Sequence, residues 1–182
     1  MQQPTLNIAR LCLRPFRFAD APEVQRLAGD PLVADTTLSI PHPYPDGAAE
    51  AWIARHQSGF ESRGPAVYAM TLGDGGQLVG TISLINVSLA DARAELGYWV
   101  GVEYWRRGYC TEAARALIAF AAESWSITRI VAKCLARNPA SARVMEKLGM
   151  SYEGRLPLHT HKNGRFEDLL LYGLNVGDRR VA

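Results

Sequence analysis

Residues 95–122 constrain the fold of this chain most strongly, because they join a strand, a glycine-containing loop and a helix in close succession. The strand is predicted over residues 95–100, where the aromatic and β-branched side chains of Tyr98, Trp99 and Val100 stand together. A glycine and several polar residues follow and end the strand. The segment therefore predicts a strand that leads through a short loop into a helix.

The loop after this strand has the composition of an anion-binding site. It consists of Arg106, Arg107, Gly108, Tyr109, Cys110 and Thr111. From Glu112 onward, apolar residues recur three or four positions apart, which predicts a helix with Thr111 as its N-cap. Such a helix start directs unpaired backbone N–H groups at one point, where phosphate binds well. Two interpretations stay open: a phosphate or pyrophosphate site, or an ordinary turn with a solvated arginine pair.

Residues 104–113 resemble the acetyl-CoA-binding motif of the GNAT superfamily of N-acetyltransferases. In that motif, Gln/Arg-x-x-Gly-x-Gly/Ala, the loop amides hold the cofactor pyrophosphate. Here Trp105 stands where Gln or Arg is usual, and Cys110 stands where Gly or Ala is usual. The pattern Tyr-Trp-x-x-Gly-Tyr-x-Thr-Glu-Ala is similar to the branch of ribosomal-protein N-terminal acetyltransferases (Rim type). The resemblance implies acetyl-CoA as co-substrate, bound by this loop.

Bulk composition excludes several other classes of protein. The 182 residues predict a single domain over residues 1–182, with a core over about residues 10–174. A net charge of +2 is too small to indicate nucleic acid or an anionic membrane as partner, and no long apolar run or N-terminal signal is visible. Three cysteines (Cys12, Cys110, Cys134) without a Cys-x-x-Cys pattern predict no disulfide framework, and hence a reducing cytoplasm.

The residue patterns in the first part of the chain predict alternating strands and helices. The expected elements are a strand over residues 10–16, a helix over 20–29 with Asp20 as N-cap, an extended loop over 30–45, a helix over 48–62, and a β-hairpin over 65–86 with its turn at 73–76.

The second part predicts one further helix between strands. A strand is expected over residues 129–135, and a helix begins after Asn138 as N-cap, with Pro139 first. That helix ends at Gly149 with a Schellman cap. Two strands, over residues 150–156 and 167–174, follow, with a turn at Asn163 and Gly164 between them. These elements predict an α/β (α+β) fold. The resemblance implies the GNAT fold, a mixed and mostly antiparallel sheet of about seven strands with helices on both faces.

The resemblance also implies how the cofactor arm lies. In the family, two central strands splay apart and hold pantetheine in the gap; the matching strands here are residues 95–100 and 129–135. The main chain of Tyr98, Trp99 and Val100 would contact the cofactor, while their side chains could be ordinary core. Asn138 is explained by its N-cap role alone, and the resemblance adds a contact near the thioester.

Two residues are candidates for acid–base chemistry. An amine must lose its proton before it attacks a thioester, and Glu95 is the candidate base; the alternative is a solvated carboxylate at a strand start. The leaving thiolate needs a proton or a hydrogen bond. Many family members place a tyrosine on the helix after the Asn, but Met145 stands at that position. Ser141 is the candidate substitute; the alternative is a local cap bond.

Four later residues have weaker patterns. His159 and His161 could form a metal pair, but with no third ligand in view a surface position or a place in the acceptor wall is favoured, and no metal is predicted. Asp168 and Tyr172 lie in a late strand that sometimes builds the acceptor pocket in the family.

The predicted function is acetyl transfer from acetyl-CoA to a primary amine, either a protein N-terminal amine or a small-molecule amine. The loop over residues 30–45 holds only two carboxylates, Asp30 and Asp35, which disfavours a polycationic acceptor. A non-catalytic module that binds or senses acyl-CoA is the alternative, and a nucleic-acid-binding protein is poorly supported. Dimers are common among similar proteins, which suggests a homodimer by analogy.

Overall fold

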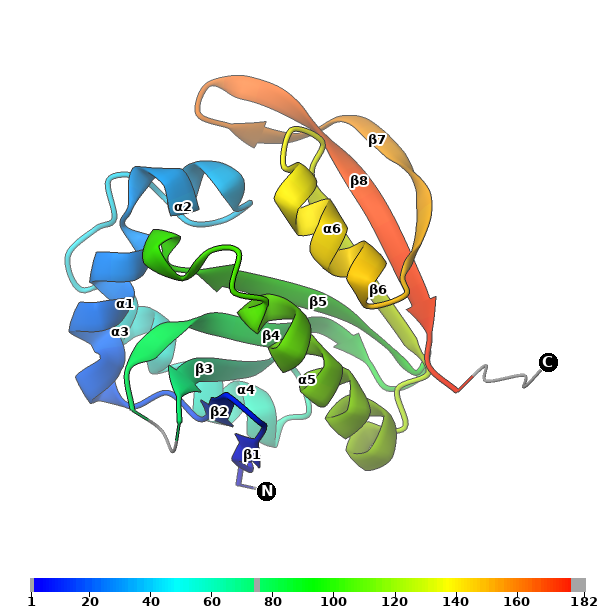
Figure 1. The fold of residues 1–182 in the computed structure, drawn as a ribbon, viewed down its shortest axis with the longest axis horizontal. Coiled ribbons are helices and arrows are strands. Elements are labelled where there is room, and N and C mark those ends of the chain that lie inside the picture. Colours follow the sequence, from blue (N-terminus) through cyan, green and yellow to red (C-terminus); the bar gives the residue numbers. More distant parts are fainter. Residues whose placement is uncertain (1, 74–75, 178–182) are drawn as a thin grey trace.

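Eight strands form one sheet in the computed structural model, which describes residues 2–73 and 76–177 (Figure 1). Their order across the sheet is β1-β2-β3-β4-β5-β6-β8-β7, and only the β5–β6 pair is parallel. The strands are β1 (Leu6–Asn7), β2 (Leu11–Arg14), β3 (Ala66–Leu72), β4 (Leu78–Ser88), β5 (Arg93–Val100), β6 (Arg129–Leu135), β7 (Ser151–Lys162) and β8 (Arg165–Asn175). The predicted mixed, mostly antiparallel sheet is confirmed.

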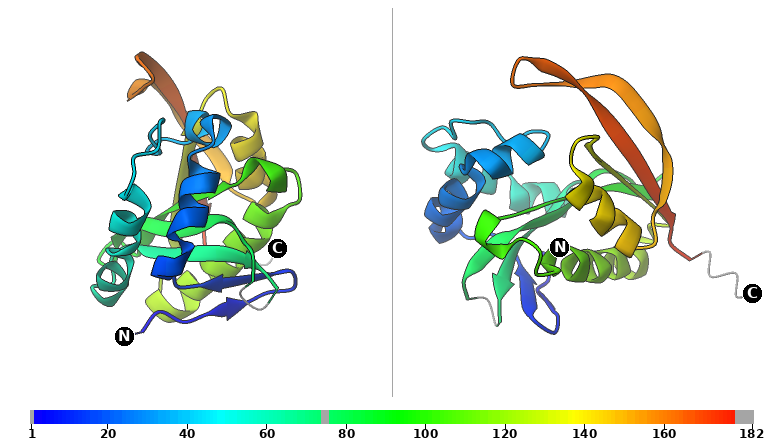
Figure 2. Two further views of the ribbon diagram at one scale, coloured as in Figure 1. Left: turned by 90° about the vertical axis from the view of Figure 1, so that its left-hand side faces the viewer. Right: turned by 45° about the horizontal axis from the view of Figure 1, so that its top comes forward.

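Six helices and two 3₁₀ turns surround the sheet within residues 2–73 and 76–177. They are η1 (Phe18–Asp20), α1 (Ala21–Ala28), α2 (Pro31–Thr36), α3 (Ala48–Ile53), α4 (His56–Glu61), η2 (Val102–Tyr104), α5 (Tyr109–Trp125) and α6 (Pro139–Lys147). Figure 2 shows α1, α2 and α3 gathered at one side of the molecule and α5 and α6 at the other. None of the helices in the described ranges is long and apolar enough to span a membrane.

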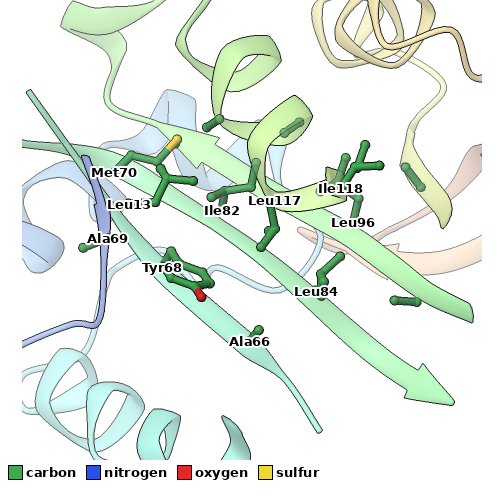
Figure 3. Packing of buried hydrophobic residues seen from close by; sticks show 14 of the residues in the cluster. Leu13, Ala66, Tyr68, Ala69, Met70, Ile82, Leu84, Leu96, Leu117 and Ile118 are labelled. Atoms are coloured by element: carbon green, nitrogen blue, oxygen red, sulfur yellow. The ribbon is translucent and has the colours of Figure 1, made fainter. Parts of the chain in front are cut away.

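The core lies between the sheet and the apolar side of α5. Leu117 is fully buried and Ile118 nearly so; both face the strands, close to Ile82 and Leu96 (Figure 3). Each fully buried aliphatic side chain of this kind contributes about 1.5–3 kcal/mol relative to exposure. The helical spacing predicted from the sequence therefore matches the packed side of α5.

The two central strands β5 and β6 separate after their first residues. They pair from Arg93 with Arg129 to Leu96 with Ala132, and the later residues of β6 pair only with β8. On that edge of β5, residues 97–100 therefore have no strand partner among the described residues. The predicted splay of these two strands is confirmed, and it opens a gap in the middle of the sheet.

Two local predictions about the N-terminal half were wrong. The expected extended loop over residues 30–45 begins with α2, because Asp30 Oδ1 accepts a hydrogen bond from Leu32 N–H at 2.8 Å and Pro31 starts the helix. The expected single helix over residues 48–62 is broken into α3 and α4. At the break, the backbone bonds tighten to a three-residue spacing, with Arg55 N–H donating to Trp52 O at 3.3 Å.

The strand count and lengths also differ from expectation. β1 adds an eighth strand, which its two residues were too short to reveal. β7 and β8 extend to the predicted turn, where Asn163 and Gly164 both have positive φ. The Schellman cap at Gly149 is confirmed, since Met150 N–H donates to Met145 O at 3.1 Å. Residues 74 and 75 of the expected hairpin turn lie outside the described residues.

Candidate active site

A cleft of about 1050 Å³ passes through the gap between β5 and β6. Strand register separates its lining into two sets, because successive side chains of a strand point to opposite faces. Tyr98 and Cys134 point to the face covered by α5 and α6, called here the α5 face. Glu95 and Lys133 point to the opposite face, which α1 and α3 cover, called here the α1 face. The cleft therefore connects both faces of the sheet.

The loop at the α5 face is shaped by two residues with positive φ, Arg106 (φ 62°) and Gly108 (φ 81°). Helix α5 begins directly after Gly108, which is its N-cap. The prediction of Thr111 as N-cap was wrong; Thr111 lies in the first turn and lines the cleft. The left-handed turn at Gly108 brings the first N–H groups of a 17-residue helix to the cleft, which is a favourable place for phosphate.

Trp105 anchors this loop to the end of β5. Its indole Nε1–H donates to the Val100 carbonyl at 2.9 Å, so that carbonyl is already bonded within the chain. Arg106 lines the cleft. The Arg107 guanidinium instead lies 5.8 Å from the centre of the Tyr104 ring, outside the lining residues.

Glu112, in the first turn of α5, is held by Arg10. The Arg10 backbone N–H donates to Glu112 Oε1 at 2.9 Å, and its Nε donates to Oε2 at 2.7 Å. The carboxylate suits the positive end of the helix dipole. Because Arg10 neutralises it, Glu112 adds little net negative charge beside the loop.

Cations predominate along the cleft. Besides Arg106, the lining includes Arg143 and Lys147, which lie four residues apart on α6 and were missed by the sequence analysis. Their i, i+4 spacing after the Asn138 cap was a usable signal, because it places both side chains on one side of the helix. Together with the N-terminus of α5, they make this end of the cleft suitable for a polyanionic ligand.

Asn138 and Ser141 lie together at the start of α6. Asn138 Oδ1 accepts a hydrogen bond from Ser141 N–H at 3.1 Å, which is the predicted N-cap, and its Nδ2 donates to Thr36 O at 3.0 Å. The Ser141 hydroxyl lies 2.9 Å from the Tyr98 hydroxyl. The side chain of Tyr98 therefore belongs to this cluster, which the sequence did not reveal.

Glu95 is buried on the α1 face and is held by two neighbours. Asn86 Nδ2 and Lys133 Nζ both donate to Glu95 Oε2 at 3.0 Å. Glu95 is only 9% exposed, so the alternative of a solvated carboxylate at a strand start was wrong. Of the two carboxylate oxygens, Oε1 is the one left open to a substrate within the part of the chain that the structure describes.

The wall of the cleft formed by residues 31–41 is tied to neighbouring elements. Arg137 pairs with Asp35 at 2.7 Å and with Glu167 of β8 at 2.9 Å. Lys162, at the end of β7, donates to Ile40 O at 2.8 Å. These bonds join the α2 region to the β7–β8 hairpin, whose tip lies beyond α6 (Figure 1).

Comparison with known proteins decides the family. Residues 10–151 match the family described as the acetyltransferase (GNAT) domain. The chain belongs to the GNAT acetyltransferase family. The family that residues 104–113 resemble is therefore confirmed.

Individual relatives of this GNAT chain include Rim-type proteins. It is 33% identical over 96 residues to the ribosomal-protein-serine acetyltransferase of Escherichia coli K12, covering 53% of this chain and 54% of that one. It is 26% identical over 171 residues to the uncharacterised N-acetyltransferase p20 of Bacillus licheniformis, covering 93% and 95%. RimL, the ribosomal L7/L12 α-N-protein acetyltransferase solved with coenzyme A, is 18% identical, with a TM-score of 0.87 over 95% of this chain and 98% of that one. The chain spans 54–55% of the length of three curated relatives that it matches.

The remaining predicted residues of this GNAT chain do not line the cleft. Met145 is buried core. Asp168 accepts from Leu158 N–H at 2.7 Å, and Tyr172 donates to Glu146 at 3.4 Å. His159 and His161 are exposed on β7, and no group of three possible metal ligands occurs in residues 2–73 and 76–177.

Proposed function

We propose that this chain is an N-acetyltransferase of the Rim-type branch, which moves an acetyl group directly from acetyl-CoA to a primary amine. One observation carries the proposal: the gap between β5 and β6 joins a cationic cleft on the α5 face to the buried carboxylate of Glu95 on the α1 face. A thioester that passes through this gap from the α5 face would meet an amine that approaches from the α1 face.

The α5 face supplies the groups that a coenzyme A molecule needs. The N–H groups at the start of α5, in Tyr109, Cys110 and Thr111, and the side chain of Arg106 suit the pyrophosphate. Arg107 adds positive charge nearby, although it is not among the residues that line the cleft. Arg143 and Lys147 offer further cations to the phosphates. The unpaired edge of β5 offers backbone groups to the amides of pantetheine, and Asn138 stands where the arm would end.

The reaction needs one group on each side of the gap. Glu95 accepts the proton of the attacking amine, directly or through a water molecule. The nitrogen then forms a bond to the carbonyl carbon, and the carbon–sulfur bond breaks with its electron pair on sulfur. Ser141 donates a hydrogen bond to that sulfur, which stabilises the thiolate.

The acceptor that fits best is the α-amino group at the N-terminus of a protein. Such an amine has a typical pKa of about 7.7–8.0, so a substantial part is already neutral at neutral pH, whereas a lysine amine needs far more help. On the α1 face, Glu95 is the single carboxylate lining the cleft in the described residues, and Lys133 neutralises it. That arrangement gives a polyamine nothing to bind. The relatives named as ribosomal-protein acetyltransferases support the same class of acceptor.

Release of free thiol from acetyl-CoA tests this proposal. One acceptor pool holds short peptides with varied free N-termini, and a second holds small amines, including polyamines and aminoglycosides. We expect thiol release with the peptides alone. Release with small amines alone would refute the protein acceptor. If neither pool gave thiol release while acetyl-CoA still raised the melting temperature, a non-catalytic acyl-CoA sensor would be favoured.

A further inference from the structure

The Tyr98 side chain crosses from β5 to the first turn of α6, on the α5 face of the gap. Its hydroxyl oxygen lies 3.0 Å from the Ser141 backbone carbonyl and 2.9 Å from the Ser141 hydroxyl. The side chain is mostly enclosed by core and cleft residues, and this burial raises the pKa of the Tyr98 phenol above its usual value of 10. Tyr98 therefore keeps its proton at neutral pH and remains a hydrogen-bond donor.

One proton and two nearby acceptors allow two arrangements of this pair. When Tyr98 donates to the Ser141 carbonyl, the Ser141 hydroxyl can donate to the Tyr98 oxygen, and both protons are used within the pair. When Tyr98 donates to Ser141 Oγ instead, the Ser141 proton is free to point into the cleft. Negative charge on an atom in the cleft favours this second arrangement, because a charge-assisted bond is about twice as strong as a neutral one.

We propose that Tyr98 is a positioning residue that aims the Ser141 O–H at the sulfur of the bound thioester. This inference rests on the proposed function. As the carbon–sulfur bond breaks and its electron pair moves to sulfur, Tyr98 donates to Ser141 Oγ and Ser141 donates to the sulfur. No proton leaves Tyr98, since a thiol of ordinary pKa, about 8.5, is a far stronger acid than this phenol. The thiolate later leaves ionised or takes a proton from water.

A purely structural role would have a different signature. The same bond also joins β5 to α6 across the gap, so a mechanical tie would affect cofactor binding and the melting temperature. A positioning role acts on the leaving sulfur and therefore lowers kcat while the Kd for coenzyme A stays constant. It also requires that Tyr98 have no effect once the Ser141 hydroxyl is gone.

The test is a double-mutant cycle of Tyr98→Phe and Ser141→Ala, with kcat, the KM and Kd for the cofactor, and the melting temperature measured for each variant. Phe keeps the ring and removes one oxygen. We expect Y98F to lower kcat about tenfold, to leave Kd within about twofold, and to add nothing to S141A in the double variant. Tyr68→Phe, which removes a buried hydroxyl of β3 outside the cleft, is the matched control and should keep the kcat of the unmodified chain.

Three results would overturn the inference. They are an unchanged kcat in Y98F, losses from Y98F and S141A that multiply in the double variant, and a loss of coenzyme A binding equal to the loss of kcat. Lack of turnover by the unmodified chain with every acceptor would overturn the proposed function and this inference together. Normal turnover by the unmodified chain together with an unchanged kcat in Y98F would overturn only the inference about Tyr98.

Discussion

His56 is a titratable residue whose imidazole ring is buried and therefore largely shielded from water. Both ring nitrogens lack a hydrogen-bond partner within the described part of the chain, and the ring packs against those of Trp52 and Phe16. Burial lowers the pKa of His56 from 6.5 to about 4. His56 is the first residue of α4, directly after the break between α3 and α4.

Stability should therefore depend on pH through His56. Because the folded pKa lies below the unfolded one, the unfolded chain binds more protons between pH 6.5 and 4, and stability is lost as the pH falls through that window. The loss between pH 7.5 and 5 should be about 2 kcal/mol. Urea unfolding at both pH values, compared with His56→Phe, measures it. An identical pH dependence in the two proteins would contradict this origin.

Cys110 is a second group whose pKa bears on its role. Burial raises the pKa of the Cys110 thiol to about 12, which leaves almost no thiolate at neutral pH. A nucleophilic role for Cys110 is therefore disfavoured, and a steric role for this small side chain in the loop is the better explanation. We expect Cys110→Ala to keep turnover within about threefold. A loss of a hundredfold or more, with cofactor binding intact, would restore the nucleophile.

At the scale of elements, the loop before α5 shows both the strength and the limit of sequence reasoning. The motif over residues 104–113 predicted the position of the loop, and the spacing of the apolar residues after it predicted the helix. Residue preference then favoured Thr111 as N-cap, whereas the structure uses Gly108. A left-handed backbone at Gly108 leaves no periodic signal, so the three-residue error in the helix start could not be seen from preferences alone.

The positive φ of Gly108 gives a prediction for the loop. Gly108→Ala adds a Cβ with room beside Arg10, at 3.5 Å, so the cost is backbone strain of about 1–2 kcal/mol at φ 81°. The strained loop should shift its N–H groups and weaken coenzyme A binding about tenfold in a calorimetric titration. Gly149→Ala is the matched control, because φ is 80° there and the residue lies outside the cleft lining.

The control separates general destabilisation from a local effect. Both alanine variants should lose similar unfolding free energy, since both positions carry the same strain. Only G108A should lose cofactor affinity. Equal affinities in the two variants would show that the loop is not the phosphate site.

At the scale of the whole molecule, the gap in the sheet organises the site. Strand periodicity predicted β5 and β6, and the family resemblance implied their splay. The pairing of Glu95 with Lys133, 38 residues away, and of Arg137 with Asp35, 102 residues away, left no local trace. Such contacts depend on the register between distant elements, which a single sequence does not display. The two strands that border the gap were therefore predictable, and the side chains that surround Glu95 were not.

We propose that the cleft binds the cofactor at one face of the sheet and that Glu95 deprotonates the acceptor at the other. The most direct measurement compares turnover and acetyl-CoA affinity in Glu95→Gln, with Glu123→Gln, an exposed α5 carboxylate outside the cleft, as control. We expect E95Q to lose about 10²–10⁴-fold in turnover and to keep its cofactor affinity. Turnover equal to that of E123Q, or a loss of affinity as large as the loss of turnover, would contradict it.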